Sequence, residues 1–297
     1  MGNSNVLDDL EPYLKPNAGV QIFDSLAVAP IDFKNPYTRA NAVYFDNHAW
    51  ASGYFRACHR DRTFKERWHS AIGSWNDKVV VDIGCGPGNL FATLGGKPKK
   101  LIGVDVSKVA LGMAREIGYA PLQADAHNLP LVSEFADIVA LNATLHHCDE
   151  MATVLGEAAR LVRPGGVLIC DHDPQLTAWD WRGLGMLLYK IRLPLYRLFQ
   201  GHVWEEQRHR MASETHHRPG HGVTPALFIS ILEPLNFDVK LYPHNNSSGA
   251  ETFDLVKGRS KFKYRMGPDT VRHRPGLDRG STLAHVHRGP RSPLRLA

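Results

Sequence analysis

A glycine-rich turn directly after a short apolar run most constrains how this 297-residue chain can fold. Residues 79–83 form a run rich in β-branched side chains, which predicts a buried strand. Gly84, Gly86 and Gly88 follow at two-residue intervals, and residues 89–94 predict a helix that ends at two glycines. Such glycines permit a tight turn and let a ligand approach the backbone closely. We therefore expect a strand–turn–helix unit with a ligand site at its turn.

The alternation of strand and helix continues as far as residue 171. Further strands are predicted at 101–105, 121–125, 136–141 and 167–171, with helices at 107–118 and 149–162 between them. Continuously apolar strands that alternate with helices are typical of a parallel sheet covered on both faces. The predicted fold class is α/β, with a Rossmann-like, doubly wound, mainly parallel sheet of seven strands.

Polar residues stand where the predicted strands end. Asp82, Asp105, Asp125 and Asn142 occupy these positions, and ligands of parallel sheets bind beyond the carboxyl ends of the strands. Asp105 lies 21 residues after Gly84, where a carboxylate can accept hydrogen bonds from both hydroxyls of a ribose. Proteins that bind nicotinamide dinucleotides use the same device. Their glycine pattern, however, is G-x-G-x-x-G, whereas this chain has G-x-G-x-G.

The motifs of residues 76–172, taken together, resemble those of a known family. The segments VVVDIGCGPG, LIGVDVS, QADAHNLP, FADIVALNATLHH and LVRPGGVLI stand in the order of the class I S-adenosylmethionine-dependent methyltransferase motifs. The chain is similar above all to the broad small-molecule group whose fourth motif ends in Leu-His-His. The resemblance implies S-adenosyl-L-methionine as cofactor.

The resemblance also implies roles for individual residues. The glycine turn would surround the aminoacyl tail, Asp105 would bind the ribose, Asp125 would lie at the adenine and Asn142 beneath the cofactor. The implied cofactor-binding residues are Asp82, Gly84, Gly86, Gly88, Asp105, Val106, Asp125, Ala126 and Asn142. Other interpretations remain open: the glycines could serve strand-to-helix packing, Asp105 and Asn142 could cap the segments that follow them, and Asp125 could be a loop residue.

Two histidines are candidates for catalysis. Transfer of an activated methyl group needs a general base only if the acceptor must lose a proton. His147 follows the fourth strand near the expected methyl position, although such histidines often shape the pocket without acting as a base. His172, flanked by Asp171 and Asp173, is a second candidate base; the same triplet could instead bind a metal or form a polar turn. The histidines of 209–221 match no compact zinc pattern, so no metal site is expected.

The flanking regions predict the domain organisation. We expect an N-terminal helical extension or cap at 1–75 and a methyltransferase domain at 76–260. This domain would comprise a cofactor-binding core at 76–173, a substrate-cap insertion at 174–222, and a C-terminal helix with strands at 223–260. Those strands are predicted at 237–242 and 252–257, and an arginine-rich disordered tail at 261–297.

The segment 176–200 bears on the acceptor. Its leucines and isoleucine recur at helical spacing among several cations. We interpret it as a hydrophobic cap, which favours an apolar, lipid-like or aromatic small molecule. Packing against the sheet and a peripheral membrane contact are the alternatives.

Charge and composition restrict partners and location. Residues 265–297 hold seven arginines and two aspartates, so the tail accounts for the whole net charge of +5, and a nucleic-acid partner is not expected. No apolar run approaches the length of a membrane span, and no secretory start is present, so a cytoplasmic location is expected. A nicotinamide-dependent oxidoreductase and a non-catalytic cofactor-binding protein remain as alternative functions. The oligomeric state is open.

Overall fold

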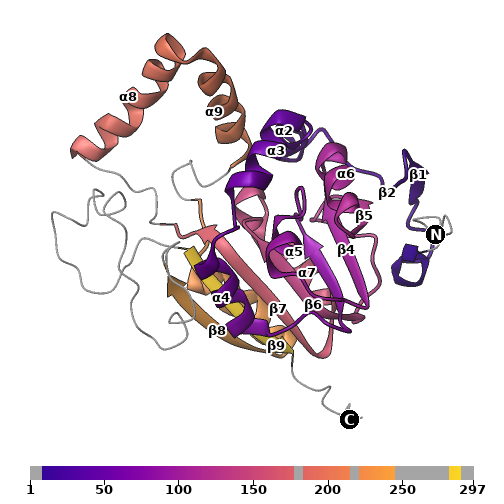
Figure 1. The fold of residues 1–297 in the computed structure, drawn as a ribbon. Helices are drawn as coiled ribbons and strands as arrows, with labels where there is room; N and C mark the ends of the chain where they lie inside the picture. Colours follow the sequence, from indigo (N-terminus) through magenta and orange to yellow (C-terminus); the bar gives the residue numbers. More distant parts are fainter. Residues whose placement is uncertain (1–8, 177–182, 215–220, 245–280, 289–297) are drawn as a thin grey trace.

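A single mixed sheet organises the chain. The computed structural model describes residues 9–176, 183–214, 221–244 and 281–288. Among these residues nine strands pair in the order β1-β2-β5-β4-β3-β6-β7-β9-β8 (Figure 1). The strands are β1 (Gln21–Phe23), β2 (Leu26–Val28), β3 (Val79–Ile83), β4 (Lys100–Asp105), β5 (Ala120–Gln123), β6 (Ala136–Asn142), β7 (Val162–Pro174), β8 (Phe237–His244) and β9 (Ser281–Arg288).

The parallel centre of the sheet is doubly wound. β3 pairs in parallel with both β4 and β6, so the chain moves outward on one side through β4 and β5 and on the other through β6 and β7. Every residue of β3 is buried, including the carboxylate of Asp82 near its end, as expected for a central strand of a parallel sheet. The strand order reverses at β3, which places a ligand crevice at the carboxyl ends of β3, β4 and β6. The Rossmann-like α/β prediction is confirmed.

The predicted number of seven strands is wrong. β1 and β2 form an antiparallel pair, and β2 extends the sheet by pairing in parallel with β5. Each of these strands is only three residues long, too short to show a periodic pattern. They form because the open edge of β5 offers backbone partners. The extension 1–75 is therefore not wholly helical.

The prediction of a disordered tail at 261–297 is wrong at β9. This strand inserts between β7 and β8 and pairs antiparallel with both. Its sequence STLAHVHR is locally suited to a strand, but the arginine, glycine and proline around it obscured the pattern. The strand predicted at 252–257 lies outside the described residues. The strand predicted at 237–242 corresponds to β8.

Helices cover both faces of the sheet. The side chains of α4 (Arg62–Ile72), α5 (Asn89–Leu94) and α6 (Lys108–Glu116) share one buried cluster with one face of the central strands. Those of α7 (Met151–Leu161) and α10 (Pro225–Leu232) share a second cluster with the opposite face. Val80 belongs to the first cluster and Val81 to the second, as alternation along a strand requires.

Two helices lie over the carboxyl ends of the strands. They are α2 (Pro36–Phe45) and α3 (His48–Ala57), which appear above the sheet in Figure 1. Asn35 and Asn47 cap them, because each side-chain oxygen accepts from two backbone N–H groups of the first turn. The helical part of the extension predicted at 1–75 thus includes three α-helices, α2, α3 and α4.

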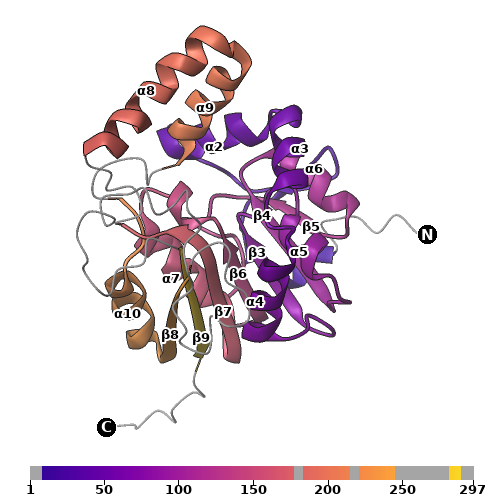
Figure 2. The same cartoon turned by 60° about the vertical axis from the view of Figure 1, so that its left-hand side comes forward.

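The insertion at 174–222 contains a helical hairpin. It consists of α8 (Gly183–Phe199) and α9 (Gly201–Ser213), and α9 packs against α2. In both views α8 projects away from the sheet (Figures 1 and 2). Short 3₁₀ turns complete the described chain at η1 (Glu11–Tyr13), η2 (Leu145–His147) and η4 (Glu233–Leu235). In the part of the chain that the structure describes, no helix combines the length and apolarity needed to cross a bilayer.

Candidate functional site

The three glycines of the turn after β3 differ in what surrounds them. All have positive φ, at +69° for Gly84, +51° for Gly86 and +89° for Gly88. A Cβ on Gly84 would lie 2.5 Å from Thr144 Oγ1, and one on Gly88 would overlap Ile117. A Cβ on Gly86 would meet nothing within 4 Å. Gly84 and Gly88 therefore permit close packing, whereas Gly86 leaves its backbone open to a ligand.

A cavity of about 830 Å³, including the solvent at its mouth, lies beside this turn. Most of the residues that the sequence singled out line it together: Asp82, Gly84, Gly86, Asp105, Val106, Asp125, Ala126, Asn142 and His147. Gly88 and His172 do not line it.

Asp105 is held in place by the backbone. Its Oδ2 accepts from the N–H of Gly86 and its Oδ1 from the N–H of Ser107, both at 2.9 Å. Burial raises the pKa of Asp105 to about 6, against the opposing effect of these hydrogen bonds. Each carboxylate oxygen keeps a second lone pair for a ligand hydroxyl. Asp105 thus also holds the backbone of Gly86 in place. The pattern of strands in the sequence did not predict this hydrogen bond.

Asp82 lies deeper, at the end of β3. The hydroxyl of Tyr119 donates to Asp82 Oδ2 at 2.7 Å, and burial raises the pKa of Asp82 to about 7. Tyr119 is a buried partner of Asp82 that no sequence motif indicates, because it stands in an ordinary apolar segment.

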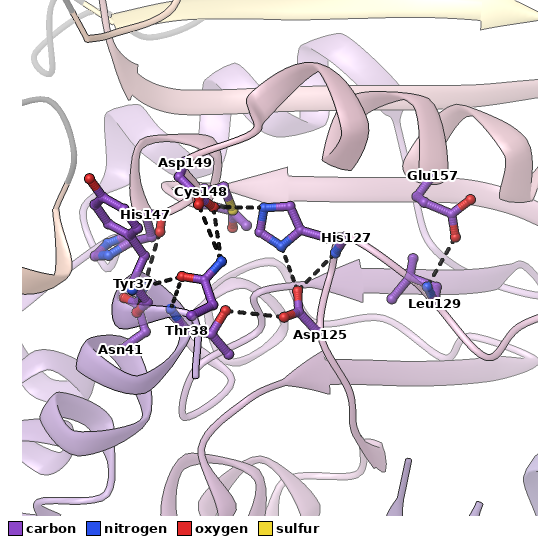
Figure 3. Close-up of polar contacts among 12 residues, drawn as sticks. Tyr37, Thr38, Asn41, Asp125, His127, Leu129, His147, Cys148, Asp149 and Glu157 are labelled. Carbon is purple, nitrogen blue, oxygen red and sulfur yellow. Dashed lines mark hydrogen bonds and ion pairs between the residues drawn. The ribbon is translucent and has the colours of Figure 1, made fainter. Parts of the chain in front are cut away.

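Asp125 is the centre of a polar network that ties α2 to the sheet (Figure 3). Its Oδ2 accepts from Thr38 Oγ1 at 3.1 Å, and its Oδ1 accepts from the backbone N–H of His127 at 2.9 Å. The Nδ1 of His127 lies against the same Oδ1, and its Nε2 lies 3.2 Å from Asp149 Oδ1. Asp149 in turn accepts from the amide of Asn35 at 3.2 Å. The network was not predicted, since its members are scattered over the sequence.

The pairing between Asp125 and His127 changes the pKa of both groups. The hydrogen bond with Asp125 raises the pKa of His127 above its ordinary value. Burial acts to raise the pKa of Asp125, but the hydrogen bonds from His127 and Thr38 outweigh it and hold that pKa below its ordinary value. Each group therefore stabilises the charged form of the other.

Asn142, at the carboxyl end of β6, has a buried Oδ1 with no hydrogen-bond partner among the described residues. Buried polar atoms in folded proteins are nearly always paired, so this oxygen in a cavity wall suits a ligand donor. No lysine or arginine appears among the described residues that line the cavity, whereas Asp82, Asp105 and Asp125 do. Such a wall suits a ligand with cationic groups and disfavours a pyrophosphate.

The two adjacent histidines of η2 have different partners. His146 Nδ1 lies 2.8 Å from Asp173 Oδ1, away from the residues that line the cavity. His147 Nδ1 lies 3.1 Å from the carbonyl oxygen of Ser213 at the end of α9. A carbonyl only accepts, so Nδ1 of His147 carries the hydrogen and Nε2 keeps its lone pair. Burial lowers the pKa of His147 to about 3, which keeps the ring neutral.

Metal-binding atoms do approach one another near this pair. Those of His146, His147 and Glu214 all lie within 4.8 Å of each other. Glu214, however, accepts from Arg210 Nε at 2.7 Å, so a protein cation already balances its charge. The histidines bond to Asp173 and Ser213 as described above. The expectation that the chain has no metal site stays a prediction.

His172 lies beside a buried ion pair between α4 and β7. Arg67 Nη2 lies 3.0 Å from Asp171 Oδ2, which also accepts from the indole of Trp68 at 2.9 Å. The ring of His172 lies 4.5 Å, centre to centre, from that of His59, which lines the cavity. His172 is thus separated from the cavity by one ring, and its catalytic role stays a prediction.

Comparison with known proteins decides between the families that share this kind of crevice. Residues 81–170, which include the glycine turn and the ends of β4, β5 and β6, match the family model described as a methyltransferase domain. Residues 81–170 thus form a methyltransferase domain. The resemblance of the sequence motifs to methyltransferases is thereby confirmed, and the narrower grouping by the Leu-His-His ending stays a prediction.

Relatives of the methyltransferase domain include enzymes named for several acceptors. The malonyl-[acyl-carrier protein] O-methyltransferase of Pectobacterium atrosepticum is 33% identical over 40% of this chain and 47% of its own length. The ubiquinone biosynthesis O-methyltransferase of Thiobacillus denitrificans is 30% identical over 40% of this chain and 55% of its own length. The chain thus spans about half the length of these curated relatives.

A solved structure shares the fold. The methyltransferase domain and its flanking elements superpose on a chain of the complex between the Haloferax volcanii Trm112 methyltransferase activator and a methyltransferase. The TM-score is 0.50 at 17% identity, over 85% of this chain and 99% of that one. This similarity extends the shared fold beyond the matched segment.

Proposed function

We propose that this chain transfers the methyl group of S-adenosyl-L-methionine to a small-molecule acceptor. The observation that supports this most is the cavity wall, where three carboxylates, an open glycine backbone and an unpaired amide oxygen meet. The cofactor carries a sulfonium, an ammonium, two ribose hydroxyls and an adenine amine, which these acceptors match. A nicotinamide dinucleotide would bring a pyrophosphate to a wall of carboxylates, so the oxidoreductase alternative is disfavoured.

Each lining residue has a proposed role toward the cofactor. The backbone of the turn around Gly86, with Asp82 beneath it, would hold the aminoacyl tail. Asp105 would accept from the ribose, while Asp125 and Ala126 would contact the adenine. Asn142 would accept a donor through its unpaired Oδ1. When bound, the cofactor supplies an activated methyl group, so the protein has mainly to position the acceptor and exclude water.

His147 is proposed to orient the acceptor. Its Nε2 lone pair can accept a hydrogen bond from an acceptor O–H or N–H, because Nδ1 is engaged by Ser213. With its pKa lowered to about 3, His147 is a weak base, so it takes the proton only as transfer of the methyl group acidifies the acceptor. Its first contribution is therefore orientation.

The acceptor is proposed to be apolar or aromatic. Phe45 from α2, Tyr54 from α3 and His59 line the same cavity and contribute aromatic rings to its wall. Ring systems of this kind bind flat, apolar molecules well. The relatives named for ubiquinone and demethylmenaquinone reactions support a small-molecule acceptor for this chain as well.

Calorimetry with the demethylated product, S-adenosylhomocysteine, tests the proposal. We expect the wild-type chain to bind it, and Asp105→Ala to weaken binding by about 1–3 kcal/mol, the usual effect of losing hydrogen bonds to a charged group. Lys108→Ala, at an exposed position on α6 that does not line the cavity, serves as the control and should bind normally. Tight binding of NADH without binding of the adenosyl sulfur compound would contradict the proposal.

A further inference from the structure

The helix α8 exposes an unusual amount of apolar surface. Leu184, Leu198 and Phe199 are 66%, 73% and 74% exposed. Leu187, Leu188, Ile191 and Leu195 are also exposed. Single exposed leucines are ordinary on protein surfaces, but seven large apolar side chains on one helix of 17 residues mark a surface with a partner.

These side chains form one stripe. Residues 184, 188, 191, 195 and 198 are spaced by three or four positions, which places them along a single side of an α-helix. At 100° per residue, Leu187 and Phe199 fall at the two margins of the same stripe.

Positive charge borders the stripe. α8 carries Lys190, Arg192 and Arg197, and its sequence contains no aspartate or glutamate. By the same helical geometry Arg192 lies just beyond one margin, and the other two cations lie beyond the opposite margin. An apolar side edged by cations is typical of helices that lie in the interface of an anionic bilayer. The apolar side chains enter the acyl region, while the cations reach the lipid phosphates.

The position of α8 leaves the stripe available to a flat surface. α8 packs on α9, and both views show it standing clear of the sheet and its covering helices (Figures 1 and 2). With 17 residues it is about 25 Å long, which is shorter than the ~30 Å hydrocarbon core, and Pro194 interrupts its hydrogen bonding. The helix is therefore suited to lying on the surface of a bilayer and is too short to cross it.

The helical hairpin of α8 and α9 connects the apolar stripe of α8 to the surroundings of the cavity. Tyr44 of α2 donates from its hydroxyl to Glu206 of α9 at 3.2 Å, and Ser213 at the end of α9 contacts His147. The far end of α9 thus forms part of the cavity surroundings, about 20 Å along the helix axis from the connection to α8.

We propose that α8 is an interfacial helix that docks the protein on an anionic lipid bilayer. The cations favour a lipid surface over a second copy of this chain, since two copies of α8 would bring like charges together. This inference does not depend on the proposed methyl transfer, because adsorption can be measured without cofactor or acceptor.

Vesicle sedimentation tests the proposal. We expect the full chain to bind vesicles of phosphatidylglycerol and phosphatidylcholine at least about tenfold more strongly than vesicles of phosphatidylcholine alone, since each cation near an anionic surface adds attraction. The double substitution Leu188→Glu with Leu195→Glu should reduce binding to the anionic vesicles by at least about tenfold. Leu235→Glu, a matched exposed leucine on η4, should leave binding unchanged.

Further measurements distinguish loss of lipid binding from misfolding of the double variant and from a change of oligomeric state. Circular dichroism shows whether the double variant is folded, and calorimetry with S-adenosylhomocysteine tests the proposed function separately. Light scattering without lipid gives the oligomeric state. Wild-type chain that stays in solution with both vesicle types, or a folded double variant that binds as wild type does, would overturn the proposal. So would a wild-type dimer that the double substitution converts to monomer, since a second copy would then cover the stripe.

Discussion

At the scale of single residues, neighbouring glycines in one turn serve different purposes. Gly84 faces Thr144, whose hydroxyl also donates to the carbonyl of Ile83. Because Gly84 has no side chain, the end of β3 and the residue before η2 can pack closely against each other. Gly86 faces the cavity instead. The sequence motif alone treats the two as equivalent. The distinction follows from what would surround a Cβ at each position.

Alanine at each glycine should separate these roles. Both Gly84→Ala and Gly86→Ala place a Cβ at positive φ, which costs about 1–2 kcal/mol of unfolding free energy. Gly84→Ala should lose about 1–3 kcal/mol more, because its methyl group overlaps Thr144. Gly86→Ala should instead lose most of its affinity for S-adenosylhomocysteine. Urea unfolding and calorimetry check both effects; equal stability of the two variants, with normal binding by Gly86→Ala, would contradict the assignment.

At the scale of elements, α2 is fastened to the sheet by polar contacts. Thr38 reaches Asp125 after β5, Asn35 reaches Asp149 before α7, and His127 lies between the two aspartates. Asn41 adds a hydrogen bond to the carbonyl of His147 at 3.0 Å. α2 therefore covers the cavity on the side of Asp125 through contacts whose strength depends on protonation.

The His127 contact gives this closure a pH dependence. Because the pKa of His127 is raised by Asp125, its contribution to stability is fully present below the ordinary histidine pKa and is lost as pH rises through the raised value. Because the pKa of Asp125 is lowered, its contribution is present above the ordinary aspartate pKa and is lost as pH falls through the lowered value. We expect the difference in unfolding free energy between wild type and His127→Gln to be largest at mildly acidic pH and to shrink in alkali. Denaturant titrations at several pH values measure it, and a difference independent of pH would refute the coupling.

At the scale of the whole molecule, local patterns predicted the centre of the sheet but not its margins. Strands β3, β4 and β6 are mostly apolar and buried and carry a polar residue at or next to their last position, so the sequence predicted both the strands and their shared edge. β2 and β9 pair with strands that are distant in the sequence. β2 is too short to show a pattern, and the arginine, glycine and proline around β9 obscured the local pattern of that strand. For the site, the acids at strand ends were foreseen to lie together. Their partners Thr38 and Tyr119 were not, because helices such as α2 carry no motif and are positioned only by packing.

The crystal structure of the chain with S-adenosylhomocysteine tests the central claim most directly. We expect the adenosyl group in the cavity beside β3, β4 and β5, with its ribose hydroxyls on Asp105 and its aminoacyl tail along the backbone of Gly86. Density for the ligand elsewhere on the molecule, or in the cavity without contact to Asp105, would contradict the proposed site.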